Sequence, residues 1–329
     1  MRASPSAPSP VLPTSLLAVS LLAVTLLCGR VAAQPQAETA APRTERIEIH
    51  SDAADTDVPT VVHLPAGYDD DEARRYPVIY FLHGAGRGSE KTWEERGTVD
   101  TLVRLQEAGD MPPCLVVCPR EPRRMAFYIN WKDQDDRRHG DFVTQELPAY
   151  IDEHFRTLPT RELRALTGDS MGGYGALITA LQHPDVFGSV SAHEPSIFPE
   201  DPSYLPGWMK RGGRGEGILS RLFGEPMDEE WWLAHNVFHL IKQAESGAFA
   251  NLPIYFDVGT DDRYGLAKPC QMWHELLREK GVDHVFHLRD GGHGRRFFAD
   301  NVEHSLAFHG KLLAKALEKA ATGDDASDG

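Results

Sequence analysis

Apolar residues along this chain gather into short continuous runs that amphipathic stretches separate. Residues 76–82 (YPVIYFL) and 113–118 (PCLVVC) are the clearest runs, and such runs are typical of central strands covered by helices on both faces. The first two predicted strands are more mixed and suggest an antiparallel start. The pattern predicts strands at residues 46–50, 58–64, 76–82, 113–118, 161–167, 188–192, 253–259 and 284–288.

The stretches between the strands have helical periodicity. In the helix expected at residues 140–155, Pro148 must introduce a kink because proline lacks an N–H group. Strands and helices alternate along the chain, so we expect a mostly parallel sheet flanked by helices in one domain at residues 45–319. Helices are predicted at residues 98–108, 140–155, 172–182, 268–280 and 297–319.

Residues 197–251 interrupt this alternation. They contain a glycine-rich stretch at 212–217 and an aromatic-rich segment at 229–244 that predicts a helix. A long insertion between strands is typical of a lid or substrate-binding wall, and a packing cap without a substrate role is the alternative. The acidic tail at residues 320–329 has the composition of a disordered segment.

The N-terminus has the pattern of an export signal. An apolar run at residues 11–28 precedes Val31 and Ala33, small residues at the −3 and −1 positions of a cleavage site. We therefore expect a signal peptide at residues 1–33, a polar linker at 34–44, and a secreted or periplasmic protein without stable membrane association. An uncleaved membrane anchor is the alternative, because the run is about as long as a short spanning helix.

Charge and cysteine content exclude several classes of protein. The 329 residues carry a formal net charge of −15, which argues against a nucleic-acid partner. Cleavage would leave Cys114, Cys118 and Cys270; the first two lie about 13 Å apart on one predicted strand, too far for a disulfide. His235 and His239 have the helical spacing of zinc ligands but no third partner. We expect buried thiols, no metal and no cofactor.

The clearest chemical motif is Gly168-Asp-Ser-Met-Gly172, which fits the G-x-S-x-G nucleophile elbow. The bare motif occurs by chance in about one chain in ten of this length. Here it lies between a predicted strand at 161–167 and a predicted helix at 172–182, as an elbow requires. The context therefore predicts that Ser170 is a nucleophile.

A serine hydroxyl needs a base, and the base needs an acid that orients it. His293 follows the last predicted strand and is flanked by glycines, so it is the expected base. Asp261 and Asp262 follow the preceding strand, where the acid should lie. We favour Asp262, deeper in the loop, with Asp261 capping the turn. Asp257 inside that strand and Glu194 after the strand before it remain alternatives.

The oxyanion of a tetrahedral intermediate needs backbone N–H donors. One donor is expected from Met171, directly after the nucleophile. The second should come from the loop His83-Gly-Ala-Gly86, where glycines allow a close approach of the backbone. We expect the Ala85 N–H to be that donor and the His83 side chain to be structural.

Taken in order, these motifs resemble the esterase D-like α/β-hydrolases, which include S-formylglutathione hydrolases, feruloyl and acetyl-xylan esterases, siderophore esterases and mycolyltransferases. The likeness runs from about residue 45 to 315. It implies the α/β-hydrolase fold, with Ser170, Asp262 and His293 as the triad and the two donors named above as the oxyanion hole. The motifs that carry it are YFLHG (80–84), FYINW (127–131), ELPAYIDEHF (146–155), GDSMGG (168–173), GTDD (259–262) and GGH (291–293).

These observations predict a secreted serine esterase that hydrolyses carboxylic esters through an acyl-enzyme. Export and the aromatic-rich insertion favour a small-molecule or polysaccharide-linked ester, such as a feruloyl or acetyl group on carbohydrate. An acyltransferase with the same triad is the first alternative, and a non-catalytic binding protein on a hydrolase scaffold is the second. The polar segment at 123–138 and the insertion at 210–217 depart from the family pattern and leave the substrate open.

Overall fold

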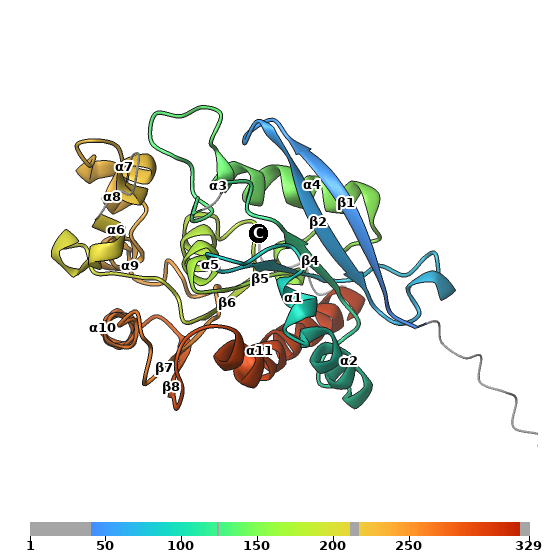
Figure 1. Ribbon diagram of the computed structural model, residues 1–329. Helices are drawn as coiled ribbons and strands as arrows, with labels where there is room; N and C mark the ends of the chain where they lie inside the picture. The colour runs from blue at the N-terminus through green and yellow to red at the C-terminus, as the bar shows by residue number, and fades with distance from the viewer. Residues whose placement is uncertain (1–40, 124, 211–216, 323–329) are drawn as a thin grey trace, which may run out of the picture. The chain divides into compact units, whose positions relative to one another are not determined.

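The computed structural model describes residues 41–322 except 124 and 211–216 (Figure 1). Among these residues, eight strands form one sheet in the order β1-β2-β4-β3-β5-β6-β7-β8. The first two strands are antiparallel to each other, β2 is antiparallel to β4, and the remaining neighbours are parallel. The strands are β1 Arg43–Ser51, β2 Thr56–Leu64, β3 Val78–Leu82, β4 Leu115–Pro119, β5 Arg164–Asp169, β6 Ser189–His193, β7 Ile254–Gly259 and β8 His284–Arg289.

Helices cover both faces of the sheet (Figure 1). Side chains of α1, α2 and α11 pack into the core on one face, and those of α4, α5 and α10 pack into the core on the other. The helices are α1 Thr92–Glu95, α2 Thr98–Ala108, α3 His139–Asp141, α4 Leu147–His154, α5 Met171–Gln182, α6 Gly207–Lys210, α7 Ile218–Phe223, α8 Glu229–Ala234, α9 Val237–Gln243, α10 Ala267–Glu279 and α11 Arg295–Thr322.

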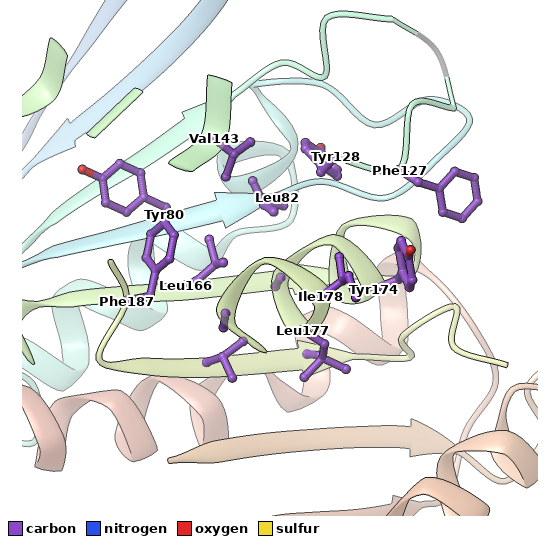
Figure 2. Packing of buried hydrophobic residues seen from close by; sticks show 14 of the residues in the cluster. Tyr80, Leu82, Phe127, Tyr128, Val143, Leu166, Tyr174, Leu177, Ile178 and Phe187 are labelled. Carbon is purple, nitrogen blue, oxygen red and sulfur yellow. The ribbon is translucent and has the colours of Figure 1, made fainter. Parts of the chain in front are cut away.

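Strand β3 explains why the central runs are apolar at every position. Ile79 and Phe81 pack into one core, whereas Tyr80 and Leu82 point to the other face. Figure 2 shows Tyr80 and Leu82 among buried side chains of β5 and α5, and the Tyr80 ring meets Phe187 edge-on at 5.9 Å. Each such side chain contributes about 1.5–3 kcal/mol when fully buried. The predicted α/β class and mostly parallel sheet are therefore confirmed.

Two predicted elements differ in how they are built. Strand β5 begins at Arg164 because Arg161–Leu163 form a 3₁₀ turn. The helix expected at 140–155 consists of α3, a π-helical turn at Phe142–Glu146 and α4, with Pro148 in the first turn of α4. The π turn accommodates the missing N–H of that proline.

The single helix predicted at residues 229–244 is wrong. The segment forms α8 and α9, which are separated at His235 and Asn236. The side-chain oxygen of Asn236 accepts hydrogen bonds from the N–H groups of Phe238 and His239 at 3.0 and 3.2 Å. This N-cap starts a new helix and ends the old one.

The predicted ends of the chain fall largely outside the described residues. The signal peptide at 1–33 lies wholly outside them, as does most of the predicted linker at 34–44, although β1 already begins at Arg43. At the other end, α11 continues to Thr322, so the first three residues of the predicted disordered tail are helical. No helix in the described part combines the length and apolarity needed to cross a bilayer. Among the described residues, Cys114, Cys118 and Cys270 are buried free thiols, as expected.

Candidate active site

The elbow holds Ser170 in a strained backbone conformation between β5 and α5. Its φ of 54° and ψ of −114° are rare for a residue with a side chain, and such strain is characteristic of functional sites. The Ser170 N–H donates to the His193 carbonyl at 2.7 Å. A Cβ added at Gly168 or Gly172 would come closer than 3.0 Å to backbone atoms. The motif needs its glycines because strand and helix meet here backbone to backbone.

The three residues predicted as a triad lie together. His293, in the loop between β8 and α11, has its Nε2 2.9 Å from Ser170 Oγ and its Nδ1 2.6 Å from Asp262 Oδ2. Asp262 follows β7, and the carboxyl ends of the parallel strands bring all three residues to one edge of the sheet. An imidazole with its proton on Nδ1 donates to the carboxylate and accepts from the serine hydroxyl. The arrangement can therefore activate Ser170.

Asp262 both bonds to His293 and caps the turn that follows β7. Its Oδ1 accepts hydrogen bonds from the N–H groups of Tyr264 and Leu266 at 2.8 and 3.4 Å, while Oδ2 faces His293. Asp261 is exposed, and its own N–H donates to the Gly291 carbonyl. The expectation that the Asp261 side chain caps this turn is wrong, because Asp262 caps it.

Glu194 stands behind the same histidine. Its Oε1 lies 3.9 Å from His293 Nδ1, too far for a hydrogen bond, and its side chain is fully buried. Both carboxyl oxygens accept from the Gly294 N–H at 3.0 and 2.9 Å. Burial raises the pKa of Glu194 to about 9 despite this hydrogen bond, and Asp262 is among the nearby carboxylates that add to the effect. Glu194 is therefore a neutral acid at pH 7 that supports the loop carrying His293.

Asp257, the remaining alternative, belongs to a different network. Its Oδ1 lies 2.8 Å from His193 Nδ1, and His193 Nε2 lies 2.8 Å from Ser305 Oγ. This is a second Ser-His-Asp set, but its three members are at most 1% exposed. A substrate cannot reach Ser305. Solvent access therefore separates Ser170, which lines the cleft, from Ser305.

The two predicted oxyanion donors lie at the cleft. Ala85 and Met171 both line it beside the nucleophile. The neighbouring Gly84 N–H donates to Asp169 Oδ1 at 2.7 Å, and Asp169 Oδ2 pairs with Arg96 at 2.7 Å. Asp169 and Arg96 were not predicted from the sequence. They fix the loop that carries Ala85, and the position of Asp169 inside the elbow motif is the only sequence signal for this role.

Two further buried groups hold the walls of the cleft. The His83 ring bridges two backbones: Nδ1–H donates to the Gly84 carbonyl at 2.8 Å, and Nε2 accepts from the Glu121 N–H at 2.9 Å. Burial lowers the pKa of His83, which keeps the ring neutral for this role. The Glu121 carboxyl accepts from the N–H groups of Met125 and Phe127, both at positive φ. His83 is structural, as expected, whereas Glu121 was missed.

The cleft has a volume of about 650 Å³. A separate apolar cavity beside it, lined mainly by residues of the insertion, has a volume of only about 20 Å³, which is room for about one water molecule. Phe127 lines both, and its ring packs edge-on against Tyr174 at 5.7 Å (Figure 2). The described part of the insertion therefore lies next to the cleft.

One group of possible metal ligands is present among the described residues: Glu194, Asp262 and His293. The facing atoms of Asp262 and His293 already share a hydrogen bond, and Glu194 accepts from Gly294. These contacts suit a hydrogen-bonded triad. His235 and His239, whose spacing resembled a zinc pair, bond separately to the Trp231 carbonyl and to Glu200.

Comparisons with known proteins identify the family of the chain. The esterase family model, described as "Putative esterase", matches residues 51–309. S-formylglutathione hydrolase of Mus musculus is 34% identical over 266 residues, covering 74% of this chain and 85% of the mouse protein.

Solved structures share the fold. A ferulic acid esterase is similar with a TM-score of 0.69 and 24% identity, covering 84% of this chain and all of that one. An S-formylglutathione hydrolase from Agrobacterium tumefaciens is similar with a TM-score of 0.66 and 21% identity, covering 84% and 98%. The chain therefore belongs to this esterase family, as a serine carboxylic-ester hydrolase with the α/β-hydrolase fold.

Proposed function

We propose that this protein is an exported esterase in which Ser170, His293 and Asp262 form the catalytic triad. The observation that carries the proposal is the continuous hydrogen-bond chain from Asp262 through His293 to Ser170, with Ser170 facing a cleft large enough for a substrate. In the second Ser-His-Asp set the Ser305 hydroxyl donates to the Val302 carbonyl at 2.9 Å and the set is buried, so it does not compete for this role.

Each residue then has one task in the reaction. Ser170 attacks the ester carbonyl while His293 Nε2 takes its proton, and Asp262 stabilises the resulting imidazolium. The Ala85 and Met171 N–H groups receive the negative charge that develops on the carbonyl oxygen. His293 then delivers the proton to the leaving alcohol, and water hydrolyses the acyl-enzyme by the same steps. The chemistry needs no cofactor.

For the substrate we propose a carbohydrate-linked ester, with a feruloyl or acetyl group. The predicted export signal and the fold shared with a ferulic acid esterase support this choice. A thioester is the second candidate, because the mouse relative at 34% identity is an S-formylglutathione hydrolase. In an acyltransferase, a sugar hydroxyl would replace water in the second half of the reaction.

A fluorophosphonate probe tests the nucleophile. The wild-type protein should be labelled at Ser170, and Ser170→Ala should not be labelled. Ser305→Ala is the matched control from the buried set and should label like wild type. An unlabelled wild type, or equal labelling of Ser170→Ala, would contradict the proposal.

A substrate panel tests the finer assignments. Initial rates on feruloylated and acetylated sugars, compared with S-formylglutathione, separate the two substrate classes. Product analysis with an added acceptor sugar separates hydrolysis from acyl transfer. Sequencing the N-terminus of exported protein tests cleavage after Ala33.

A further inference from the structure

Arginine side chains are concentrated around the cleft. Arg87, Arg96, Arg263 and Arg295 line it, and the acidic side chains in the lining are those of Glu95 and Asp169. The chain as a whole carries a formal net charge of −15. The lining therefore has the opposite sign of charge to the rest of the protein, and clefts of one sign concentrate ligands of the other.

Arg96 has a structural role and does not count toward this charge. Its guanidinium pairs with Asp169 at 2.7 Å, with side-chain exposures of 11% and 2%. It also lies over the Phe298 ring at 4.7 Å. The charges of Arg96 and Asp169 cancel, and the pair fixes the loop that carries Ala85. The charge that a substrate meets in the cleft is therefore set by the other three arginines and Glu95.

The other three arginines are exposed, and none forms an ion pair with a carboxylate in the described part of the chain. Arg263 lies over the Tyr264 ring at 5.0 Å, and that ring meets His293 edge-on at 4.7 Å. Arg295 follows His293 by two residues and donates to the backbone carbonyl of Glu95 across the cleft. Arg263 thus lies over the ring that packs on His293, and Arg295 is two residues from His293 along the chain; each is held by a contact with an uncharged group.

The reaction indicates which half of the substrate lies on the side of the cleft that carries Arg263 and Arg295. In the proposed mechanism His293 delivers its proton to the leaving group, so the leaving group lies next to His293. The carbonyl oxygen lies instead at the Ala85 and Met171 N–H groups. Arg263 and Arg295 are therefore placed to contact the alcohol or thiol half of the substrate rather than its acyl half.

We propose that Arg263 and Arg295 form an anion subsite that binds a carboxylate or phosphate on the leaving group. The inference rests on the proposed function, because it places the leaving group by the role of His293. Guanidinium groups suit such anions because their N–H donors match two oxygens at once. An acidic sugar and an anionic thiol carrier share this chemistry.

Matched esters test the subsite. In 4-acetoxybenzoate the leaving group is anionic, and in 4-acetoxybenzamide it is neutral, with the same acetyl group. After correction for their rates of hydroxide hydrolysis, wild type should prefer the anionic ester about tenfold in kcat/KM at low salt, and the preference should fall as salt screens the charges. The ratio should approach one in the Arg263→Gln, Arg295→Gln double variant.

Two controls separate the possible outcomes. Arg74→Gln, an exposed arginine outside the cleft, should keep the wild-type ratio. A charge on the acyl half, compared in phenyl hydrogen succinate and phenyl butyrate, should give no such preference.

The proposed subsite is wrong if wild type hydrolyses the neutral ester but shows no preference for the anionic one. It is also wrong if the double variant keeps the wild-type preference. If wild type hydrolyses neither acetate ester, the proposed function itself fails. Comparing S-formylglutathione with an acetylated uronic acid then distinguishes the two sources of the anion.

Discussion

Replacing Glu194 with glutamine should remove a pH-dependent contribution to stability. In the folded protein the Glu194 carboxyl is fully buried, and burial raises its pKa from 4.5 to about 9. Between these values the folded state holds a proton that the unfolded state releases. The contribution of Glu194 to the free energy of unfolding of the wild type is therefore fully present below pH 4.5. It is lost as the pH rises toward 9.

The magnitude follows from linkage. Each pH unit in this window changes the free energy of unfolding by about 1.4 kcal/mol, or on the order of 4 kcal/mol between pH 5 and pH 8. Glutamine does not titrate, and its carbonyl oxygen can still accept from the Gly294 N–H. The variant should therefore gain stability relative to wild type as the pH rises, by about 1.4 kcal/mol for each pH unit.

Urea unfolding of both proteins at several pH values from 5 to 8 measures the difference. Glu303→Gln is the control. The exposed Glu303 carboxylate bonds to Arg104, which lowers the pKa of Glu303. The difference in free energy of unfolding between this variant and wild type should therefore stay constant at every pH above 5. A flat difference for Glu194→Gln, or one that falls with pH, would refute the reasoning and mean that Glu194 is ionised in the folded protein.

Three further predictions follow from the site. Asp262→Asn should lower kcat on p-nitrophenyl acetate about a thousandfold or more, whereas Asp261→Asn should stay near the wild-type rate; equal losses would contradict the assignment of the acid. Gly172→Ala should cost more than about 3 kcal/mol in urea unfolding because its Cβ would overlap the end of β3. Gly247→Ala has open space around its Cβ but a φ of 83°, so it should cost only the roughly 1–2 kcal/mol of a left-handed backbone. Ser305→Ala should lose about 1–2 kcal/mol of stability and keep fluorophosphonate labelling; loss of labelling would mean that the buried set takes part in catalysis.

The sequence by itself determined the sheet and indicated Ser170 as the candidate nucleophile. Continuous apolar runs predicted the central strands because a strand buried on both faces must be apolar at every position. The elbow was recognisable because its glycines are required locally, where strand and helix backbones touch. His293 could be found for a related reason: in a parallel sheet, residues that follow the strands meet at one edge.

Only the tertiary structure decided which carboxylate serves His293 and which serine is accessible. Three carboxylates lie at or after neighbouring strands: Asp257, Asp262 and Glu194. The distance to His293 Nδ1 separates the last two, because it is 2.6 Å from Asp262 Oδ2 and 3.9 Å from Glu194 Oε1. The second Ser-His-Asp set has the same residue types, and its burial and the bond from Ser305 to the Val302 carbonyl set it apart. Arg96 was also hidden, because its contact with Asp169 joins segments far apart in the chain. Glu121 bonds within its own loop, to the N–H groups of Met125 and Phe127, and that loop has no regular sequence pattern. Local patterns specify backbone conformation, whereas pKa, access and pairing depend on which distant side chains the fold brings together.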